Sequence, residues 1–134
     1  MINYEELLEK AKQMTEYSYC PYSKFAVGAC ILFESGKAYG GCNVENASYG
    51  LSLCAERNAI FTAITDGVKK GDFKEINVMV SSGKIGMPCF VCRQMISELF
   101  DEDAIVRCYS TNGESKEYTV KELCPYPFGE DDLQ

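Results

Sequence analysis

Runs of lysine or arginine are missing from this sequence. Its 134 residues carry 13 basic and 20 acidic side chains, which gives a formal net charge of −7. Proteins that grip a polynucleotide normally present a basic stripe that displaces counterions from the phosphates. We therefore expect no nucleic-acid partner, and a substrate that is small and either uncharged or cationic.

Apolar runs of membrane-spanning length, about 20 residues, are also missing. The first residues, Met1–Glu6, include acidic side chains where a secretory signal would be basic, and no apolar segment follows them. These absences predict a protein that has no membrane partner and works in the cytoplasm. No internal repeat or interdomain linker is visible, and the length is close to the commonest domain size, so residues 1–134 are expected to form one domain.

Histidine is absent altogether, whereas cysteine occurs eight times. In a cytoplasmic chain, a C-x-x-C pair is more typical of metal binding or catalysis than of a structural disulfide. Cys89 and Cys92 form such a pair, and Cys54 opens a second stretch, Cys-Ala-Glu-Arg. The other five cysteines are predicted to be small buried hydrophobic residues: Cys20, Cys30, Cys42, Cys108 and Cys124.

Three cysteines fit an open zinc site better than a closed one. Zinc takes four ligands, and a catalytic zinc has three from the protein, with the fourth position left for water. Pro88 is expected in the first turn of a helix, which puts Cys89 and Cys92 on one face near a helix N-terminus that favours thiolates. Glu56 is not needed as a ligand and is free for proton transfer. We predict one zinc ion per chain, held by Cys54, Cys89 and Cys92.

Hydrophobic periodicity and turn residues predict elements in the order α-β-β-α-β-α-β-β-α. The expected helices are about 4–17, 53–65, 88–100 and 120–123, and the expected strands are 25–33, 37–44, 75–81, 105–110 and 116–119. This order is typical of an α/β fold in which helices cover both faces of a mixed sheet. Each cysteine-bearing helix follows a strand and a loop, so the helix N-termini can meet beyond the strand ends, where open α/β sheets bind ligands.

These motifs resemble those of the zinc nucleoside deaminases, and in particular the small homotetrameric cytidine deaminases that use three cysteine ligands. The resemblance implies a three-layer α-β-α sandwich around a five-stranded mixed sheet. It covers nearly the whole chain, and the matching stretches occur in the right order: Pro21–Phe25, Val27–Ala29, Gly41–Ala47, Cys54–Arg57, Pro88–Gln94 and Pro125–Phe128.

The same resemblance implies zinc-dependent hydrolytic deamination of cytidine and deoxycytidine, with release of ammonia, as in pyrimidine salvage. Glu56 is the acid that would move the protons. Three thiolates on a divalent zinc leave a net charge of about −1, which makes the metal a weaker acid. Arg57 is therefore expected to withdraw charge through hydrogen bonds to the ligand sulfurs, and Gln94 is predicted to lie behind the ligands.

The predicted substrate pocket follows mainly from the resemblance. Strand alternation puts the side chains of Asn43 and Glu45 on one face, and family members use these positions for the ribose hydroxyls. Phe25 and Ala55 are expected to line the same pocket around the nucleoside.

Two further residues, Tyr49 and Phe128, resemble those that family members lend to the pocket of a neighbouring subunit. This implies a homotetramer with shared active sites. One departure from the family pattern concerns the residues between the paired cysteines, where Phe90 and Val91 replace a glycine and a small residue. These bulkier side chains leave the ligand spacing intact and are expected to affect the shape of the pocket or a subunit junction.

Other interpretations of the same motifs stay open. A related deaminase acting on a modified cytosine nucleoside or a blasticidin-like antibiotic would keep the zinc and Glu56. A C-x-x-C at a helix start also suits thiol–disulfide exchange, although that chemistry gives Cys54 and Glu56 no role. A structural zinc module would recruit Cys42 or another cysteine as fourth ligand. The acidic charge, and cysteine rather than histidine at the first ligand position, disfavour a polynucleotide-editing deaminase.

Overall fold

Five strands form one sheet in the order β2-β1-β3-β4-β5. The structure is a computed structural model that describes residues 3–133; residues 1, 2 and 134 of the predicted domain lie outside the described residues. Strands β3 and β4 are parallel, and the other neighbouring pairs are antiparallel, so the sheet is mixed. The strands are β1 (Val27–Phe33), β2 (Ala38–Cys42), β3 (Phe73–Val80), β4 (Phe100–Ser110) and β5 (Ser115–Thr119).

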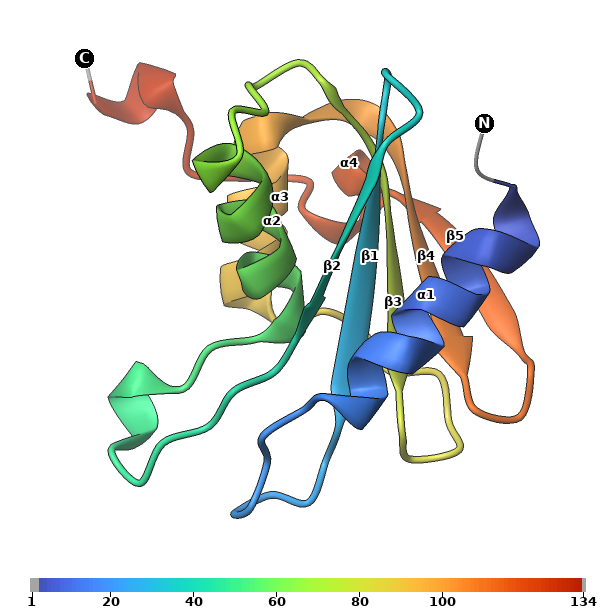
Figure 1. The fold of residues 1–134 in the computed structure, drawn as a ribbon. Helices are drawn as coiled ribbons and strands as arrows, with labels where there is room; N and C mark the ends of the chain where they lie inside the picture. The colour runs from blue at the N-terminus through green and yellow to red at the C-terminus, as the bar shows by residue number, and fades with distance from the viewer. Residues whose placement is uncertain (1–2, 134) are drawn as a thin grey trace.

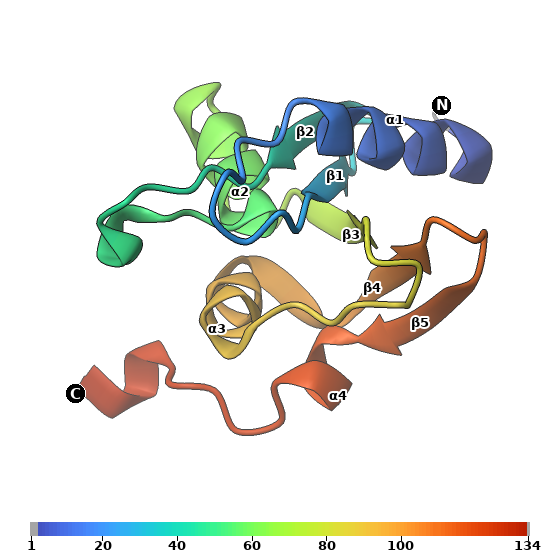
Figure 2. The same cartoon turned by 90° about the horizontal axis from the view of Figure 1, so that it is seen from below.

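Helices cover both faces of this sheet. Helix α1 packs on one face, and α2, α3 and the short α4 pack on the other (Figures 1 and 2). This arrangement confirms the predicted three-layer α-β-α sandwich around a five-stranded mixed sheet. The helices are α1 (Tyr4–Glu16), α2 (Ala55–Thr65), α3 (Phe90–Leu99) and α4 (Val120–Leu123), with short 3-10 turns η1 (Tyr49–Leu51) and η2 (Glu130–Leu133).

Alternation along the central strands separates two hydrophobic clusters, because successive side chains of a strand point to opposite faces. On the α2 and α3 side, Ile31 of β1 and Val78 of β3 join a large buried cluster. On the α1 side, Leu32 and Met79 join a smaller one, which Leu7 of α1 completes. The larger cluster supports the helices that carry the cysteines.

Glycine in β2 allows α2 to approach the sheet closely. A Cβ atom on Gly41 would lie 2.5 Å from the backbone nitrogen of Ala59 and 2.7 Å from the carbonyl oxygen of Ala55. Real Cβ atoms do not approach backbone atoms so closely, so the contact requires glycine. This contact fixes the depth at which the first turn of α2 lies on the sheet.

Some predicted boundaries and burials differ from the structure. Helix α3 begins at Phe90, because the preceding Cys89 has an extended backbone (φ −66°, ψ 164°) and serves as the N-cap residue. The placement of Pro88 in the first helical turn is therefore wrong. Cys30 and Cys108 are buried as predicted. The prediction of burial is wrong for three half-buried cysteines: Cys20, Cys42 and Cys124.

A search of residues 3–133 for a membrane-spanning segment finds no helix that is both long enough and apolar enough.

Candidate metal centre and active site

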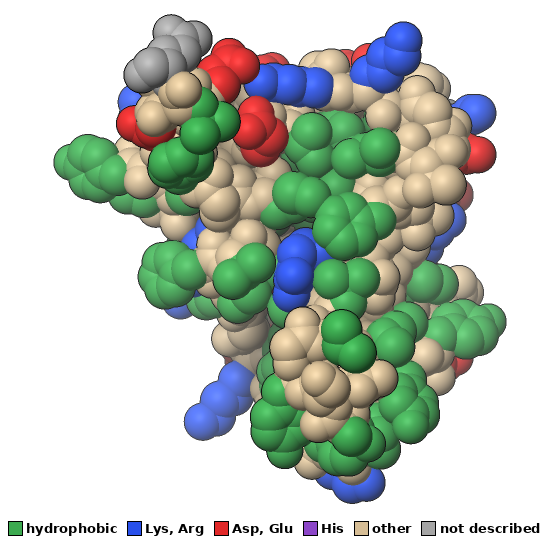
Figure 3. All heavy atoms as spheres, turned by 90° about the vertical axis from the view of Figure 1, so that its left-hand side faces the viewer, with side chains coloured by type: hydrophobic (Ala, Val, Ile, Leu, Met, Phe, Trp, Pro, Cys, Tyr) green, Lys and Arg blue, Asp and Glu red, His purple; other side chains and the backbone are tan. Residues whose placement is uncertain are grey.

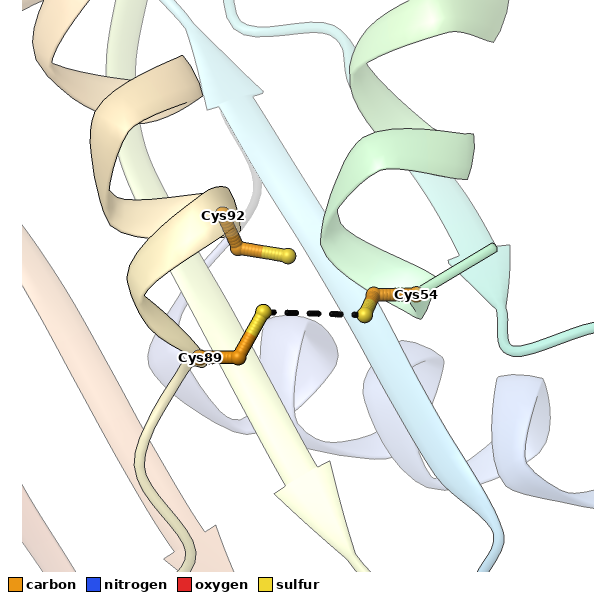
Figure 4. A group of neighbouring side chains, drawn as sticks. All are labelled: Cys54, Cys89 and Cys92. Carbon is orange, nitrogen blue, oxygen red and sulfur yellow. Dashed lines mark hydrogen bonds between the residues drawn. The ribbon is translucent and has the colours of Figure 1, made fainter. Parts of the chain in front are cut away.

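The three predicted zinc ligands lie together where two helices begin. Cys54 is the N-cap residue of α2, Cys89 is the N-cap residue of α3, and Cys92 lies in the first turn of α3. Their Sγ atoms all lie within 4.8 Å of one another. Figure 4 shows the three side chains pointing toward a common centre between the helices.

The spacing of the sulfurs fits one tetrahedral zinc ion. Two thiolates that each bind zinc at about 2.3 Å in tetrahedral geometry lie about 3.8 Å apart. The Cys54 and Cys89 Sγ atoms are 3.8 Å apart, although 35 residues separate them in the chain. Among residues 3–133, no fourth cysteine, aspartate or glutamate joins this cluster. The hypothesis of a closed site with Cys42 as fourth ligand is therefore wrong.

Electrostatic interactions among the three thiols also favour a bound cation. The neighbouring Cys92 thiol and the Arg57 guanidinium lower the pKa of the Cys54 thiol to about 5. The Cys54 thiolate, together with burial, in turn raises the pKa of Cys92. One thiolate thus opposes ionisation of its neighbour, and a divalent cation between the sulfurs would remove that opposition.

Arg57 lies beside the cluster on α2. Its Nη2 atom donates to Cys54 Sγ at 3.4 Å, and this hydrogen bond raises the pKa of the guanidinium. Its Nε atom is buried without a hydrogen-bond partner within the described residues. The guanidinium therefore adds positive charge at the ligand sulfurs, as the predicted charge compensation requires.

Glu56 follows Cys54 closely in the chain and is 3% exposed. Burial raises the pKa of its carboxyl group to about 7, and the negative charge of Cys54 adds to the increase, while hydrogen bonds to its own backbone and to Cys92 oppose it. A cation among the sulfurs would favour the ionised carboxylate. A carboxyl group poised in this way can both accept and deliver protons near neutral pH.

A cavity of about 400 Å³ opens beside the sulfurs, within the range of about 300–1,000 Å³ that is typical of small-molecule sites. Its lining includes the predicted residues Phe25, Asn43, Glu45, Ala55 and Glu56, and no lysine or arginine occurs among the described lining residues. The full lining is Ser23, Phe25, Val27, Asn43, Glu45, Ser52, Leu53, Cys54, Ala55, Glu56, Val78, Val80, Gly86, Met87 and Cys89.

Asn43 and Glu45 both hold the chain segment that forms one wall of this cavity. The Asn43 side chain accepts a hydrogen bond from the Val27 backbone nitrogen at 2.9 Å and donates to the Phe25 carbonyl at 2.8 Å. Glu45 Oε1 accepts from the backbone nitrogens of Tyr22 and Ser23, each at 3.1 Å. The contacts with Ser23 lower the pKa of Glu45, so this residue contributes a carboxylate to the cavity wall.

Other predicted residues lie outside the cavity of their own chain. Tyr49 is 77% exposed on η1, and Phe128 is 57% exposed on the C-terminal tail. Phe90 and Val91 are exposed at the start of α3 and do not line the cavity.

The structure places the Gln94 amide at the C-terminal tail rather than behind the metal ligands. It donates to the Phe128 carbonyl at 2.6 Å and accepts from the Phe128 nitrogen at 2.9 Å.

Sequence reasoning missed several lining residues. Ser23 lies inside a matching motif and Met87 directly precedes another, so their position in the chain was an available signal. Val78 and Val80 of β3 carried no sequence signal that they line a cavity. An apolar residue in a strand has the same sequence pattern whether it faces a cavity or the core.

The three thiols lie at paired helix N-termini, next to a buried carboxyl group and a cavity with no lysine or arginine among its described lining residues. This combination is typical of zinc hydrolases that act on small polar substrates. The comparisons with known proteins narrow this class. Residues 1–108 match the sequence model of the cytidine and deoxycytidylate deaminase zinc-binding region. The chain belongs to this family of zinc-dependent deaminases.

Individual relatives agree over nearly the whole chain. A cytidine deaminase of Sporosarcina psychrophila is 41% identical over 129 residues, covering 96% of this chain and 93% of the relative. The crystal structure of cytidine deaminase from Burkholderia pseudomallei superposes with a TM-score of 0.91 at 39% identity, covering 95% of this chain and all of that one. The cytidine deaminase of Mycobacterium tuberculosis gives a TM-score of 0.81 at 32% identity, covering 96% and 99% of the two chains.

Proposed function

We propose that this protein hydrolytically deaminates cytidine and deoxycytidine to uridine and deoxyuridine, releasing ammonia, in pyrimidine salvage. The observation that carries the proposal is the position of Glu56, a buried acid beside three convergent cysteine sulfurs in the wall of a cavity. Thiol–disulfide exchange would give the third sulfur and the adjacent acid no role.

Proton transfer is assigned to Glu56. Zinc held by Cys54, Cys89 and Cys92 would supply hydroxide at neutral pH. Glu56 takes the proton released from the attacking water, delivers a proton to the pyrimidine ring nitrogen, and later protonates the departing amino group. The raised pKa of its buried carboxyl group is consistent with a group that both gains and loses a proton during one turnover.

The substrate is proposed to be a nucleoside without phosphate. Glu45 offers a carboxylate oxygen and Asn43 an amide to the sugar hydroxyls, while Phe25 and Ala55 contact the nucleoside from the cavity wall. A phosphate would meet the carboxylates Glu45 and Glu56 with no lysine or arginine in the described lining to balance its charge. This arrangement disfavours a nucleotide.

We infer that the active enzyme is a homotetramer with shared sites, formed by one domain per chain. Phe61 and Ile64 are exposed on the outer face of α2, next to the polar Thr62 and Thr65. Figure 3 shows hydrophobic side chains gathered on the side of the molecule where α2 and α3 lie. Large exposed apolar side chains that gather on one face often mark an interaction site. Tyr49 and Phe128 are accordingly assigned to the pocket of a neighbouring subunit.

The proposed location is the cytoplasm, where reduced thiols are available to bind zinc. The net charge of −7 supports the absence of a nucleic-acid partner.

The proposal is tested by measuring zinc content and ammonia release together on wild type and Glu56→Gln. We expect one zinc per chain in both proteins, and a loss of cytidine turnover of about a thousandfold in the variant, because an amide cannot transfer the protons. Asp131→Asn, at an exposed position of η2, is the matched control and should retain full turnover. Turnover by Glu56→Gln close to that of wild type would contradict the proposal.

The substrate assignment needs a parallel comparison of cytidine, deoxycytidine, cytidine 5′-monophosphate and blasticidin S with the wild-type protein. We expect both nucleosides to release ammonia. The nucleotide should release it at least about a hundredfold more slowly, because its phosphate would lie near carboxylates that no positive charge balances. Preference for the antibiotic would instead favour the related deaminase with an altered pocket.

A further inference from the structure

Cys89 reaches the metal centre from a loop that has few bonds of its own. Between the end of β3 and the start of α3, the described residues 85–88 take part in a single hydrogen bond, which is accepted by the Pro88 carbonyl oxygen. The donor is Nε of Arg93, at 2.7 Å. Pro88 has no N–H group and is among the most deeply buried residues, so its carbonyl needs a donor from inside the protein.

Arg93 bonds to the peptide carbonyls on both sides of the Cys89 α-carbon. Its backbone nitrogen donates to the Cys89 carbonyl at 2.9 Å, which is the first hydrogen bond of α3. Its side chain donates to the Pro88 carbonyl just before Cys89. Two bonds from one residue thus fix the extended backbone of Cys89 that aims its sulfur at Cys54, 3.8 Å away.

The Arg93 guanidinium is itself held in place. Nη1 donates to the carbonyl of Leu123 at the end of α4, at 3.4 Å, and the guanidinium carbon lies 4.4 Å from the centre of the Phe90 ring. Its two hydrogen bonds, to the Pro88 and Leu123 carbonyls, diverge from one planar group. This geometry suits arginine, and a single lysine ammonium cannot reproduce it. Arg93 therefore links the ligand loop, the first turn of α3 and the end of α4.

We propose that Arg93 is a positioning residue for the metal centre, which presets Cys89 for zinc by holding the Pro88 carbonyl. It lies behind the ligand rather than against the metal, and it is separate from Arg57, which contacts a ligand sulfur directly. The proposal concerns metal affinity and not the substrate. It can therefore fail while cytidine deamination holds, or hold while cytidine deamination fails.

The test is the zinc affinity of purified Arg93→Met and Arg93→Lys, measured by competition with a chromogenic chelator in the absence of substrate. Partners behind metal ligands typically contribute about 10- to 100-fold to metal affinity. We expect zinc to bind at least about tenfold more weakly to Arg93→Met. Arg93→Lys should also bind more weakly than wild type, because one ammonium cannot replace the forked bonds.

The matched control is Lys121→Met, which removes a positive charge from an exposed position of α4. Its zinc affinity should stay within about twofold of wild type, since it makes no bond to the ligand loop. The sulfur-to-metal absorption bands of the cobalt-substituted proteins provide a second measurement, and they should change in the Arg93 variants and not in the control.

Zinc affinities of both Arg93 variants equal to that of Lys121→Met, with unchanged cobalt spectra, would overturn the proposal. The proposal also fails if the variants lower the unfolding free energy of metal-free and zinc-loaded protein equally, because that pattern describes a purely structural arginine. If Arg93→Met does not fold, the zinc affinity of Arg93→Lys decides the question: weaker binding than in Lys121→Met supports the proposal, and equal binding overturns it.

Discussion

At the scale of single residues, the three sulfurs determine what the side chains around them must do. Three thiolates on one divalent zinc leave excess negative charge, which weakens the metal as an acid. Arg57 supplies a positive charge at one sulfur, with Nη2 3.4 Å from Cys54 Sγ. The side chain is held partly buried on α2, so solvent screens its charge less than that of a surface arginine.

Replacing Arg57 with alanine is expected to leave zinc bound while lowering cytidine turnover by about 10- to 100-fold, because the metal loses charge compensation. Zinc content and kcat should be measured on the same preparation at neutral pH. Lys69→Ala removes an exposed lysine from the loop after α2 and serves as the control for net charge. Undiminished turnover in Arg57→Ala would show that the guanidinium is a structural group only.

A second prediction at this scale concerns a buried thiol on the α1 side of the sheet. Burial raises the pKa of Cys30 from 9.0 to about 11, Glu75 adds to the increase and Lys10 opposes it. Between these two values the folded state holds more protons than the unfolded state, so the free energy of unfolding must fall as pH rises. The stabilisation is complete below pH 9 and is lost through pH 11, for a total of about 3 kcal/mol.

This loss is measured by urea unfolding between about pH 8 and pH 11 on wild type and Cys30→Ala. The variant is expected to show a shallower alkaline decline, although its cavity lowers stability at every pH. Leu32→Val changes a neighbour in the same hydrophobic cluster without removing a titrating group, and it should keep the wild-type slope. Parallel pH curves for all three proteins would contradict the assignment.

At the scale of elements, the metal centre depends on how two helix N-termini are placed over the sheet. Cys54 and Cys89 are both N-cap residues, so any shift of α2 relative to α3 changes the spacing of their sulfurs directly. The contact of α2 with Gly41 of β2 fixes one of these positions. The loop bonds of Arg93 fix the other.

Gly41→Ala is therefore expected to affect the site from a distance. The added methyl group would meet backbone atoms of α2 at 2.5 and 2.7 Å, so the helix has to move. We expect a loss of unfolding free energy of about 1–3 kcal/mol, together with weaker zinc binding, measured by chemical denaturation and chelator competition. Gly129→Ala, where a Cβ atom meets nothing within 4 Å, should change neither quantity. Unaltered zinc affinity in Gly41→Ala would mean that α2 adapts without moving Cys54.

At the scale of the whole molecule, exposed apolar side chains gather on the side of α2 and α3. Exposed apolar residues occur on three elements of this side: η1, α2 and the start of α3. Figure 3 shows that hydrophobic side chains gather on this face. Contiguous exposed apolar surface usually marks an interaction site. The pocket lies at the N-terminal ends of α2 and α3 on this side, next to the exposed start of α3. The proposed tetramer therefore also bears on catalysis.

Phe61→Glu introduces a charge on the outer face of α2 and is expected to dissociate the assembly, because a carboxylate is costly to bury in an apolar interface. Analytical ultracentrifugation should give a smaller species, and specific activity should fall at least about tenfold if sites are shared. Tyr17→Glu alters an exposed aromatic residue just after α1, on the other face of the sheet, and should leave both unchanged. A fully active monomer of Phe61→Glu would refute the shared site.

The short-range features of this protein follow from the sequence alone. Helix and strand periodicity predicted nine elements at nearly their observed places, since each depends on neighbours within a few residues. The boundaries that differ are those set by a cap or by a neighbouring strand. The start of α3 at Phe90 depends on the extended backbone of Cys89, and β4 begins at Phe100, five residues before the predicted start at Ile105.

The metal ligands and the acid beside them could likewise be predicted from the sequence, because each motif is local. Cys54 is close to Glu56 in the chain, and Cys89 is close to Cys92. The predicted meeting of the two stretches is confirmed by the structure, but only the tertiary structure decided that Cys42 stays outside the cluster and that Gln94 holds the tail. The role of Arg93 also required coordinates, because its bonds run to a loop and to α4. Such contacts depend on how the whole chain packs, and no local pattern of residues records them.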